Sequence, residues 1–191
     1  MRFGLDVSEH QDGLPLAKAE GVEFVIIRTT DGTYHDRVFS SHFADATQAG
    51  LAIEAYHFLR SPREGTTVDE QVAASLEVLA GARVPMWLDC ETPAGLSLDD
   101  VRRAHHLFTQ EGVPVAGIYT SRSWWLRHTW GADTRPFGTL WLAFYGADSG
   151  TYPGNDAWPK SVGRQEPVMW QYTSRGRVTG YSGDVDLDAR R

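Results

Sequence analysis

The chain has 191 residues, of which 41% are hydrophobic and 23% charged, a balance that suits one folded domain over residues 1–191 and excludes a disordered chain. Its 18 basic and 25 acidic residues give a net charge of −7, and no basic block is present to neutralise phosphates, so we expect no nucleic-acid partner. The single cysteine, Cys90, excludes an internal disulfide and a cysteine-based zinc site. No apolar run approaches the roughly 18 residues of a membrane span, so we expect no membrane insertion, and we expect a monomer.

Five short apolar segments in the first part of the chain are predicted to be strands. They are rich in β-branched and aromatic residues and are nearly continuous apolar runs, which is typical of parallel strands covered on both faces. The five segments are residues 2–8, 24–30, 52–59, 85–91 and 115–121.

Segments with helical spacing lie between these strands. Thr67 and Glu70 have the spacing of a capping box at the start of one helix, and Ser97 begins a second. Residues 37–49 and the shorter 14–20 are predicted to fill the other gaps with helix. The first half of the chain therefore predicts a repeated βα unit.

The pattern changes after the fifth strand. A short helical piece over residues 124–128 is followed by strand-like segments at 139–145, 167–173 and 177–187, with no amphipathic helix between them. Gly, Pro, Asp and Ser crowd residues 146–164, which predicts a loop.

About five βα units followed by about three strands supply the eight strands that close a small barrel filled by side chains. We therefore predict an α/β fold, a modified TIM-like (β/α)5(β)3 barrel. An open doubly wound sheet is the alternative, but the Gly-rich phosphate turn usual in that fold does not follow the first strand.

Polar residues gather at the carboxyl ends of the predicted strands, as at Asp6, Asp89 and Glu91, and aspartates occupy the last segment. In a parallel barrel these ends meet on one rim, where barrel active sites are built. Acids that end a single strand are ordinary loop residues, whereas acids that end most strands predict one shared pocket.

Asp89 and Glu91 carry the sharpest chemical signal. Side chains alternate faces along a strand, so these two carboxyls point the same way, with Cα atoms roughly 6.5–7 Å apart. Two such carboxyls flanking a glycosidic bond serve as the proton donor and as support for positive charge at the anomeric carbon. The alternative is that they cap a loop or pair with Arg102 or Arg103.

Aromatic and histidine residues add weaker signals. Trp124, Trp125 and Trp130 lie in polar-interrupted sequence beyond a strand end, and exposed rings beside carboxylates predict a saccharide cleft. His10 and His57 lie near strand ends, but no His-x-His or His-Glu-x-x-His spacing supports a metal site. We expect neither a metal nor a cofactor.

From Gly4 to Leu187 the chain resembles the family 25 glycoside hydrolases, the Ch-type lysozymes (N-acetylmuramidases). The resemblance rests on the order and spacing of short segments along the chain. These segments read GLDVSEHQ, FVIIRTTDGT, AYHF, LDCE, GIYT, LWLAFY, WQYTS and VDL.

This resemblance implies a peptidoglycan hydrolase that cleaves the β-1,4 bond between N-acetylmuramic acid and N-acetylglucosamine. It implies that Glu91 is the general acid and that Asp89 assists a retaining mechanism, which family proposals route through the substrate's 2-acetamido group. The spacing of the two acids leaves a covalent nucleophile open as well. Asp6 and Asp186 complete the implied catalytic cluster. The implied substrate-binding residues are Tyr56, Tyr119, Trp141, Tyr145, Gln171 and Asp31, the last replacing the family's usual Glu.

Two other functions stay open, a non-catalytic saccharide-binding barrel and a metal-dependent cell-wall amidase or deacetylase. The expected partner is the peptidoglycan glycan strand, and the expected place of action is the bacterial cell wall. Asp6 stands where the apolar stretch of a signal peptide would run. We therefore expect either a host-cytoplasmic protein before its release, as for a phage endolysin, or secretion as part of a larger precursor.

Overall fold

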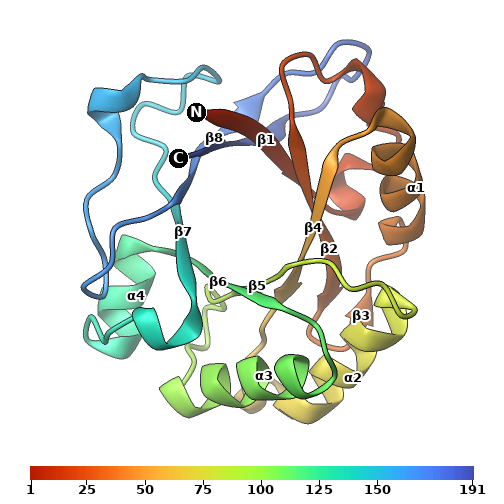
Figure 1. The fold of residues 1–191 in the computed structure, drawn as a ribbon. Helices are drawn as coiled ribbons and strands as arrows, with labels where there is room; N and C mark the ends of the chain where they lie inside the picture. The colour runs from red at the N-terminus through yellow and green to blue at the C-terminus, as the bar shows by residue number, and fades with distance from the viewer.

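Eight strands close into a barrel in the computed structural model, which describes residues 1–191 (Figure 1). All neighbours run parallel except the last strand in the chain, which is antiparallel to both of its neighbours and closes the ring. A short strand, β3 (Tyr34–His35), pairs with the second strand outside the ring. The predicted closed barrel is confirmed. In order around the ring the strands are β1 (Arg2–Val7), β9 (Val185–Arg190), β8 (Met169–Gly176), β7 (Thr139–Ala143), β6 (Val115–Ser121), β5 (Met86–Asp89), β4 (Ala52–Phe58) and β2 (Phe24–Asp31).

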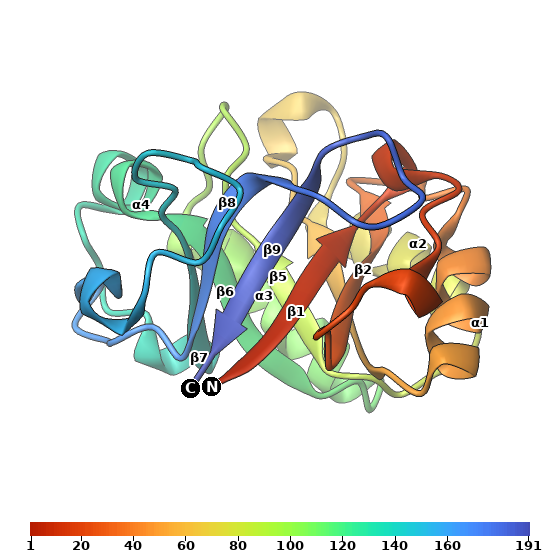
Figure 2. The same cartoon turned by 90° about the horizontal axis from the view of Figure 1, so that it is seen from above.

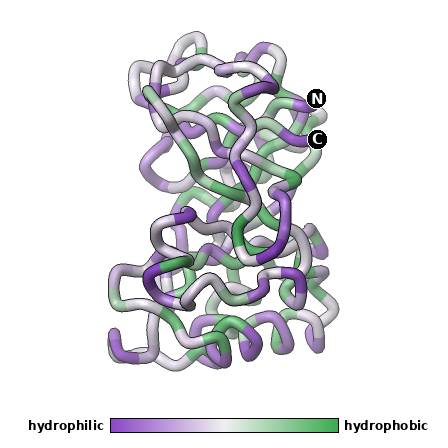
Figure 3. Tube along the Cα trace, turned by 90° about the vertical axis from the view of Figure 1, so that its left-hand side faces the viewer, coloured by the Kyte–Doolittle hydropathy of each residue, from purple (hydrophilic) through white to green (hydrophobic).

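Four helices cover the outside of the barrel: α1 (Phe39–Ala49), α2 (Val68–Leu79), α3 (Leu98–Gln110) and α4 (Arg122–Thr129) (Figure 1). In Figure 3 apolar and polar residues alternate along the helical coils, as helices with one face on the barrel require. None of these helices has the length and apolar character needed to cross a membrane. Five single turns of 3-10 helix complete the chain, at Glu9–Gln11, Leu16–Lys18, Pro62–Glu64, Arg135–Phe137 and Asn155–Ala157.

Two helices begin where the sequence predicts, because both capping boxes form. The Glu70 amide donates to the Thr67 hydroxyl at 3.2 Å, and the Thr67 amide donates to the Glu70 carboxylate at 2.7 Å. Ser97 and Asp100 make the same reciprocal pair at 3.1 and 2.9 Å. Each box satisfies amide groups that have no partner inside the helix.

Side chains that alternate along the strands build two separate cores. The outward set packs against the helices, so that Val25 on β2, Val72 on α2 and Phe108 on α3 are all fully or nearly fully buried. The inward set forms a plug inside the barrel, which we call the barrel plug, and it fills the amino-terminal part of the ring. The barrel plug consists of Phe24, Ile26, Trp87, Tyr119, Trp141 and Met169.

An aromatic cluster replaces the helix that is absent after β7. The loop predicted at residues 146–164 is present, apart from the 3-10 turn that it contains, and it lies over β8. Tyr152 and Trp158 on this loop pack at 5.8 and 5.6 Å from the Trp170 ring. Large rings therefore bury the outer face of β8 without an amphipathic helix.

Two predicted boundaries are wrong. The strand expected at 177–187 begins only at Val185, because Arg177 donates to the carbonyls of Ser182 and Gly183 at 2.9 and 3.2 Å and holds the preceding residues in a loop. The helix expected at 14–20 is the single 3-10 turn Leu16–Lys18, since Pro15 and the two flanking glycines leave too few residues for an α-helix.

An ion pair locks the amino-terminal end of the barrel. Arg190 on β9 donates to both oxygens of Glu54 on β4 at 2.6 and 2.7 Å, and the Trp87 indole donates to the same carboxylate at 2.6 Å. The Arg190 guanidinium also lies 4.4 Å from the centre of the Phe24 ring. The two charges of this lock neutralise each other, as buried charges require, although Arg190 Nε is buried without a hydrogen-bond partner.

Removing one partner of the lock should leave an uncompensated buried charge. We expect Glu54→Ala to lower the free energy of unfolding by about 3 kcal/mol, measured by urea denaturation. Glu23→Ala is the control, because Glu23 pairs with Arg2 where both side chains are about half exposed, and it should cost less than about 1 kcal/mol. Equal losses in the two variants would contradict the role assigned to the lock.

Candidate active site

A cavity of about 210 Å³ lies at the carboxyl end of the parallel strands, beyond the barrel plug; we call it the acid cavity. All four acids predicted as catalytic line it, as do five of the six predicted substrate-binding residues. The sixth, Asp31, is not among the lining residues. The lining residues are Asp6, Ser8, His10, Gln11, Arg28, Tyr56, Phe58, Asp89, Glu91, Tyr119, Trp141, Tyr145, Gln171 and Asp186.

Barrel closure and strand alternation bring the acids together. Asp6 on β1 is in register with Asp186 on β9, and Figure 2 shows these two strands side by side and running in opposite directions. β5 ends at Asp89, but the Cys90 amide still donates to the Tyr119 carbonyl at 2.9 Å, which keeps the chain extended. Asp89 and Glu91 therefore both face the acid cavity, while Cys90 lies buried in the outer core.

Gln171 on β8 joins the acids to the tyrosines. Its amide nitrogen donates to Asp6 at 2.6 Å, and its carbonyl oxygen accepts from the hydroxyls of Tyr119 and Tyr145 at 2.8 and 2.6 Å. These three bonds fix the orientation of the amide and of both phenol rings, because the two sides of an amide have opposite hydrogen-bonding roles.

Trp141 forms the floor of the acid cavity. Its ring lies 4.4 Å from that of Tyr119 and 5.7 Å from that of Trp87, and only 1% of the residue is exposed. Its indole donates at 2.8 Å to Asp188, whose other carboxyl oxygen is buried without a partner. The sequence placed Asp188 in an acidic segment but gave it no role, and the structure buries it completely beneath Asp6 and Asp186.

Burial raises the pKa of every acid in the cluster. The pKa of Asp186 rises to about 7, chiefly through desolvation and then through the nearby Glu91 charge. Desolvation also raises the pKa of Glu91, and it raises that of Asp89 well above the usual range, with the Glu91 charge adding to it. The pKa of Asp6 is raised well above its usual range by burial and by the charges of Asp186 and Asp188. These carboxyl groups therefore keep their protons to a higher pH than carboxyl groups in water do.

Arg28 is a lining residue that the sequence reasoning missed. Its guanidinium donates to Asp36 at 2.8 Å and to Glu9 at 3.2 Å, and only 7% of the residue is exposed. Strand alternation could have identified it, because Arg28 lies two and four residues after Ile26 and Phe24 and therefore points into the barrel as they do.

Asp31 instead belongs to an ion pair beside the cavity. Arg60 donates to its two oxygens at 2.5 and 2.8 Å. A β-bulge between Arg28 and Thr30 interrupts the alternation of β2 at this point, so the strand period no longer predicts where Asp31 points.

The expectation that these tryptophans are exposed is wrong for Trp124 and Trp125, although Trp124 lines a cavity together with Glu91. Both are buried where α4 packs on the barrel, and their indoles donate to the carbonyls of Thr92 and Ala132 at 2.8 and 2.7 Å. Trp130 is 93% exposed but lies outside the acid cavity. The polar neighbours of these two rings in the sequence lie on the exposed face of α4, while Trp124 and Trp125 lie on its buried face.

The two histidines near strand ends, His10 and His57, lie on opposite sides of the barrel wall. His10 lines the acid cavity, whereas His57 faces the outer core, where it hydrogen-bonds Thr30 at 2.7 Å and packs 5.9 Å from the Phe108 ring. Burial lowers the pKa of His57 to about 4, so it is neutral at physiological pH. No group of three His, Cys, Asp or Glu side chains in the chain has a metal-binding arrangement.

The chain is similar in sequence to known proteins over nearly all of its length. The family model of the glycosyl hydrolases family 25 matches residues 5–181. Lysozyme M1 of Streptomyces globisporus is 33% identical over 204 residues, covering 96% of this chain and 65% of its own length. The autolytic lysozyme of Clostridium acetobutylicum is 30% identical over 192 residues, covering 97% and 54%. The chain thus spans between about half and two thirds of the length of these curated relatives.

Solved structures cover the whole chain. A bacterial lysozyme from Streptomyces coelicolor superposes with a TM-score of 0.78 at 27% identity, covering 100% of this chain and 92% of that one. The muramidase of Trichobolus zukalii gives 0.78 at 26%, covering 100% and 94%. The catalytic domain of endolysin ply40, from a bacteriophage of Listeria monocytogenes, gives 0.74 at 26%, covering 100% and 93%.

Because the pKa of Asp186 is raised to about 7, the native state binds more protons than the unfolded state between about pH 4 and pH 7. This carboxyl therefore lowers the free energy of unfolding as the pH rises through that window. We expect Asp186→Asn to gain stability relative to the wild type, on the order of 2 kcal/mol, between pH 4.5 and pH 8 in urea denaturation. Asp45→Asn on the exposed face of α1 is the control and should show no such gain. A constant difference between Asp186→Asn and the wild type would contradict the raised pKa.

Proposed function

The chain belongs to family 25 of the glycosyl hydrolases, and on that premise we propose that it is a lysozyme that hydrolyses peptidoglycan. The bond cleaved is the β-1,4 bond between N-acetylmuramic acid and N-acetylglucosamine. The observation that carries the proposal is the burial of Asp89 and Glu91 in one cavity with raised pKa values. The lysozyme names of the two curated relatives support it.

Glu91 is the proposed general acid. It is less buried than Asp89, which places its carboxyl nearer the mouth of the acid cavity, where a glycan strand passes. A protonated Glu91 donates to the glycosidic oxygen while the bond to the anomeric carbon breaks. Glu91 then removes a proton from the water that completes the reaction with retention of configuration.

Asp89 is the proposed partner of that acid. In the substrate-assisted route, the carbonyl oxygen of the 2-acetamido group bonds to the anomeric carbon, and a positive charge develops on that group. This positive charge favours the ionised form of Asp89, whose pKa is raised in the free protein, and the ionised Asp89 then orients the acetamido N–H and stabilises the charge. Repulsion between two buried carboxylates favours one proton shared between Asp89 and Glu91, which leaves one acid and one base.

The remaining lining residues hold the sugar. Asp6 and Asp186 complete the acidic cluster, and the phenol rings of Tyr56 and Tyr145 offer apolar faces to the C–H faces of a sugar ring. The chemistry uses only these side chains, the substrate and water, and it calls for no metal or cofactor.

The proposed partner is the glycan strand of peptidoglycan, and the place of action is the bacterial cell wall. We assign residues 1–191 as a catalytic domain that acts as a monomer. The route to the wall is release from a host cytoplasm, as the phage endolysin relative suggests, or secretion within a larger precursor.

Replacing the proposed acid should stop the reaction without unfolding the protein. We expect Glu91→Gln to lower the rate of release of new reducing ends by about 10²–10⁴-fold, with a melting temperature no lower than that of the wild type. The assay is mass spectrometry of digested peptidoglycan. Glu111→Gln, on the exposed end of α3, is the matched control and should retain full activity. Release of reducing ends by Glu91→Gln at the wild-type rate would refute the proposal.

The same assay separates the other functions. New reducing-end muramic acid supports the muramidase, whereas new reducing-end glucosamine indicates a glucosaminidase. Freed stem peptides, lost on chelation, indicate a metal-dependent amidase, and binding without any new product indicates a non-catalytic saccharide-binding barrel.

A further inference from the structure

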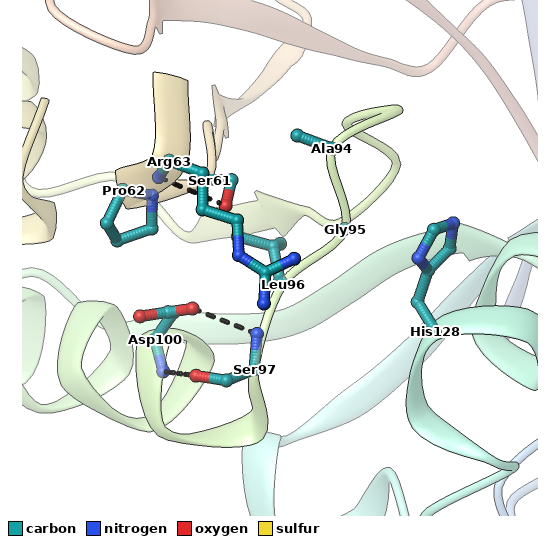
Figure 4. A pocket seen from close by; sticks show the side chains of 9 residues that line it. All are labelled: Ser61, Pro62, Arg63, Ala94, Gly95, Leu96, Ser97, Asp100 and His128. Atoms are coloured by element: carbon teal, nitrogen blue, oxygen red, sulfur yellow. Dashed lines mark hydrogen bonds between the residues drawn. The ribbon is translucent and has the colours of Figure 1, made fainter. Parts of the chain in front are cut away.

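Two more cavities continue from the acid cavity along the same rim. Glu91 lines both the acid cavity and a second cavity of about 250 Å³. His128 lines both this second cavity and a third of about 460 Å³, which Figure 4 shows. We call the second and third cavities together the side arm. Each neighbouring pair of cavities shares a lining residue, so the side arm lies directly beside the acid cavity.

Hydrogen bonds between three loops hold the side arm in shape. The Trp124 indole, on α4, donates to the Thr92 carbonyl after β5 at 2.8 Å, and the Thr92 hydroxyl donates to Glu64 after β4 at 2.6 Å. The His128 ring packs 4.7 Å from that of Trp124. These contacts join the segments that follow β4, β5 and β6, whereas the side chains of Arg63 and Arg127 are exposed.

Two arginines without ion pairs line the side arm. Arg127 lines the second cavity and Arg63 the third, and neither side chain has a carboxylate within 4.0 Å, in a protein of net charge −7. Figure 4 shows the Arg63 side chain reaching toward the first turn of α3, with His128 on the opposite side of the cavity. Asp100 also lines the third cavity, but its carboxylate accepts the Ser97 amide at 2.9 Å in the capping box.

The position of Glu91 sets the direction of the substrate. A general acid must lie within hydrogen-bond distance of the oxygen that leaves. Glu91 is the lining residue shared by the acid cavity and the second cavity, so the sugar that carries the leaving oxygen occupies the second cavity. The sugar that becomes the new reducing end then lies in the acid cavity.

We infer that the side arm binds the leaving half of the glycan strand and that Arg127 and Arg63 bind carboxylates of its muramoyl peptide. This inference rests on the proposed muramidase function. The leaving half begins with N-acetylglucosamine, which is uncharged and lies beside Trp124 and the serine hydroxyls of the second cavity. The following N-acetylmuramic acid carries a peptide with free carboxylates, and guanidinium groups bind carboxylates through paired charge-assisted hydrogen bonds.

The test uses purified peptidoglycan tetrasaccharides whose peptide carboxylates are either free or converted to neutral amides. For the wild type we expect kcat/KM to be about tenfold higher on the free-carboxylate substrate, with the difference mainly in KM. In the double variant Arg63→Gln/Arg127→Gln this preference should fall below about twofold, because kcat/KM on the free-carboxylate substrate drops toward the value on the amidated one. The charge-matched control is Arg83→Gln/Arg164→Gln, which removes two exposed arginines that line none of the three cavities and should keep the preference.

The outcomes separate this inference from the proposed function. A wild type that cleaves both substrates equally well overturns the inference and leaves the muramidase function intact. An equal loss on both substrates in Arg63→Gln/Arg127→Gln also overturns it, since the arginines then act only on structure. A wild type that releases no reducing ends from either substrate refutes the function itself.

Discussion

The antiparallel pairing of β9 with both β1 and β8 is the constraint on which the rest of the site depends. It closes the ring and sets Asp6 in register with Asp186. Closure also places Gln171 beside Asp188 in register, so one amide links the first strand to Tyr119 on β6 and to Tyr145 in the loop after β7. Without that pairing these carboxyls would lie at opposite edges of an open sheet, in water and with ordinary pKa values.

The barrel separates stability from chemistry along its axis. At the amino-terminal end, the barrel plug and the pair of Glu54 with Arg190 provide apolar burial and matched charge. At the carboxyl end, desolvation raises the pKa values of Asp89, Glu91 and Asp186, and like charge adds to it for Asp89 and Asp186, which destabilises the folded state as the pH rises. Apolar burial in the barrel plug offsets this loss of stability. The raised pKa values keep a carboxylic acid protonated at the place where the glycosidic oxygen needs a proton.

The features that depend on side-chain alternation and on the order of elements were predictable from the sequence. The features that depend on contacts between distant segments were not. The alternation of side chains correctly brought Asp89 and Glu91 to one face, and capping chemistry located two helix starts. Asp31 was assigned to the substrate by resemblance alone; it pairs with Arg60 and is not among the residues that line the acid cavity, so its role stays a prediction. Arg28 was overlooked although its inward parity was readable. The side arm was not predictable, since loops after three different strands build it and only the folded chain brings Arg63 near His128.

Titration of individual carboxyl groups tests the central claim most directly. Carbon-13 NMR of the side-chain carboxyl carbons, assigned through Asp186→Asn and Glu91→Gln, reports the protonation of each group as the pH changes. The closed and desolvated cluster predicts a midpoint near 7 for Asp186 and one above the usual range for Glu91. Midpoints for both near the usual value of about 4 would show that water reaches these groups, and the account of a proton donor held by barrel closure would be wrong.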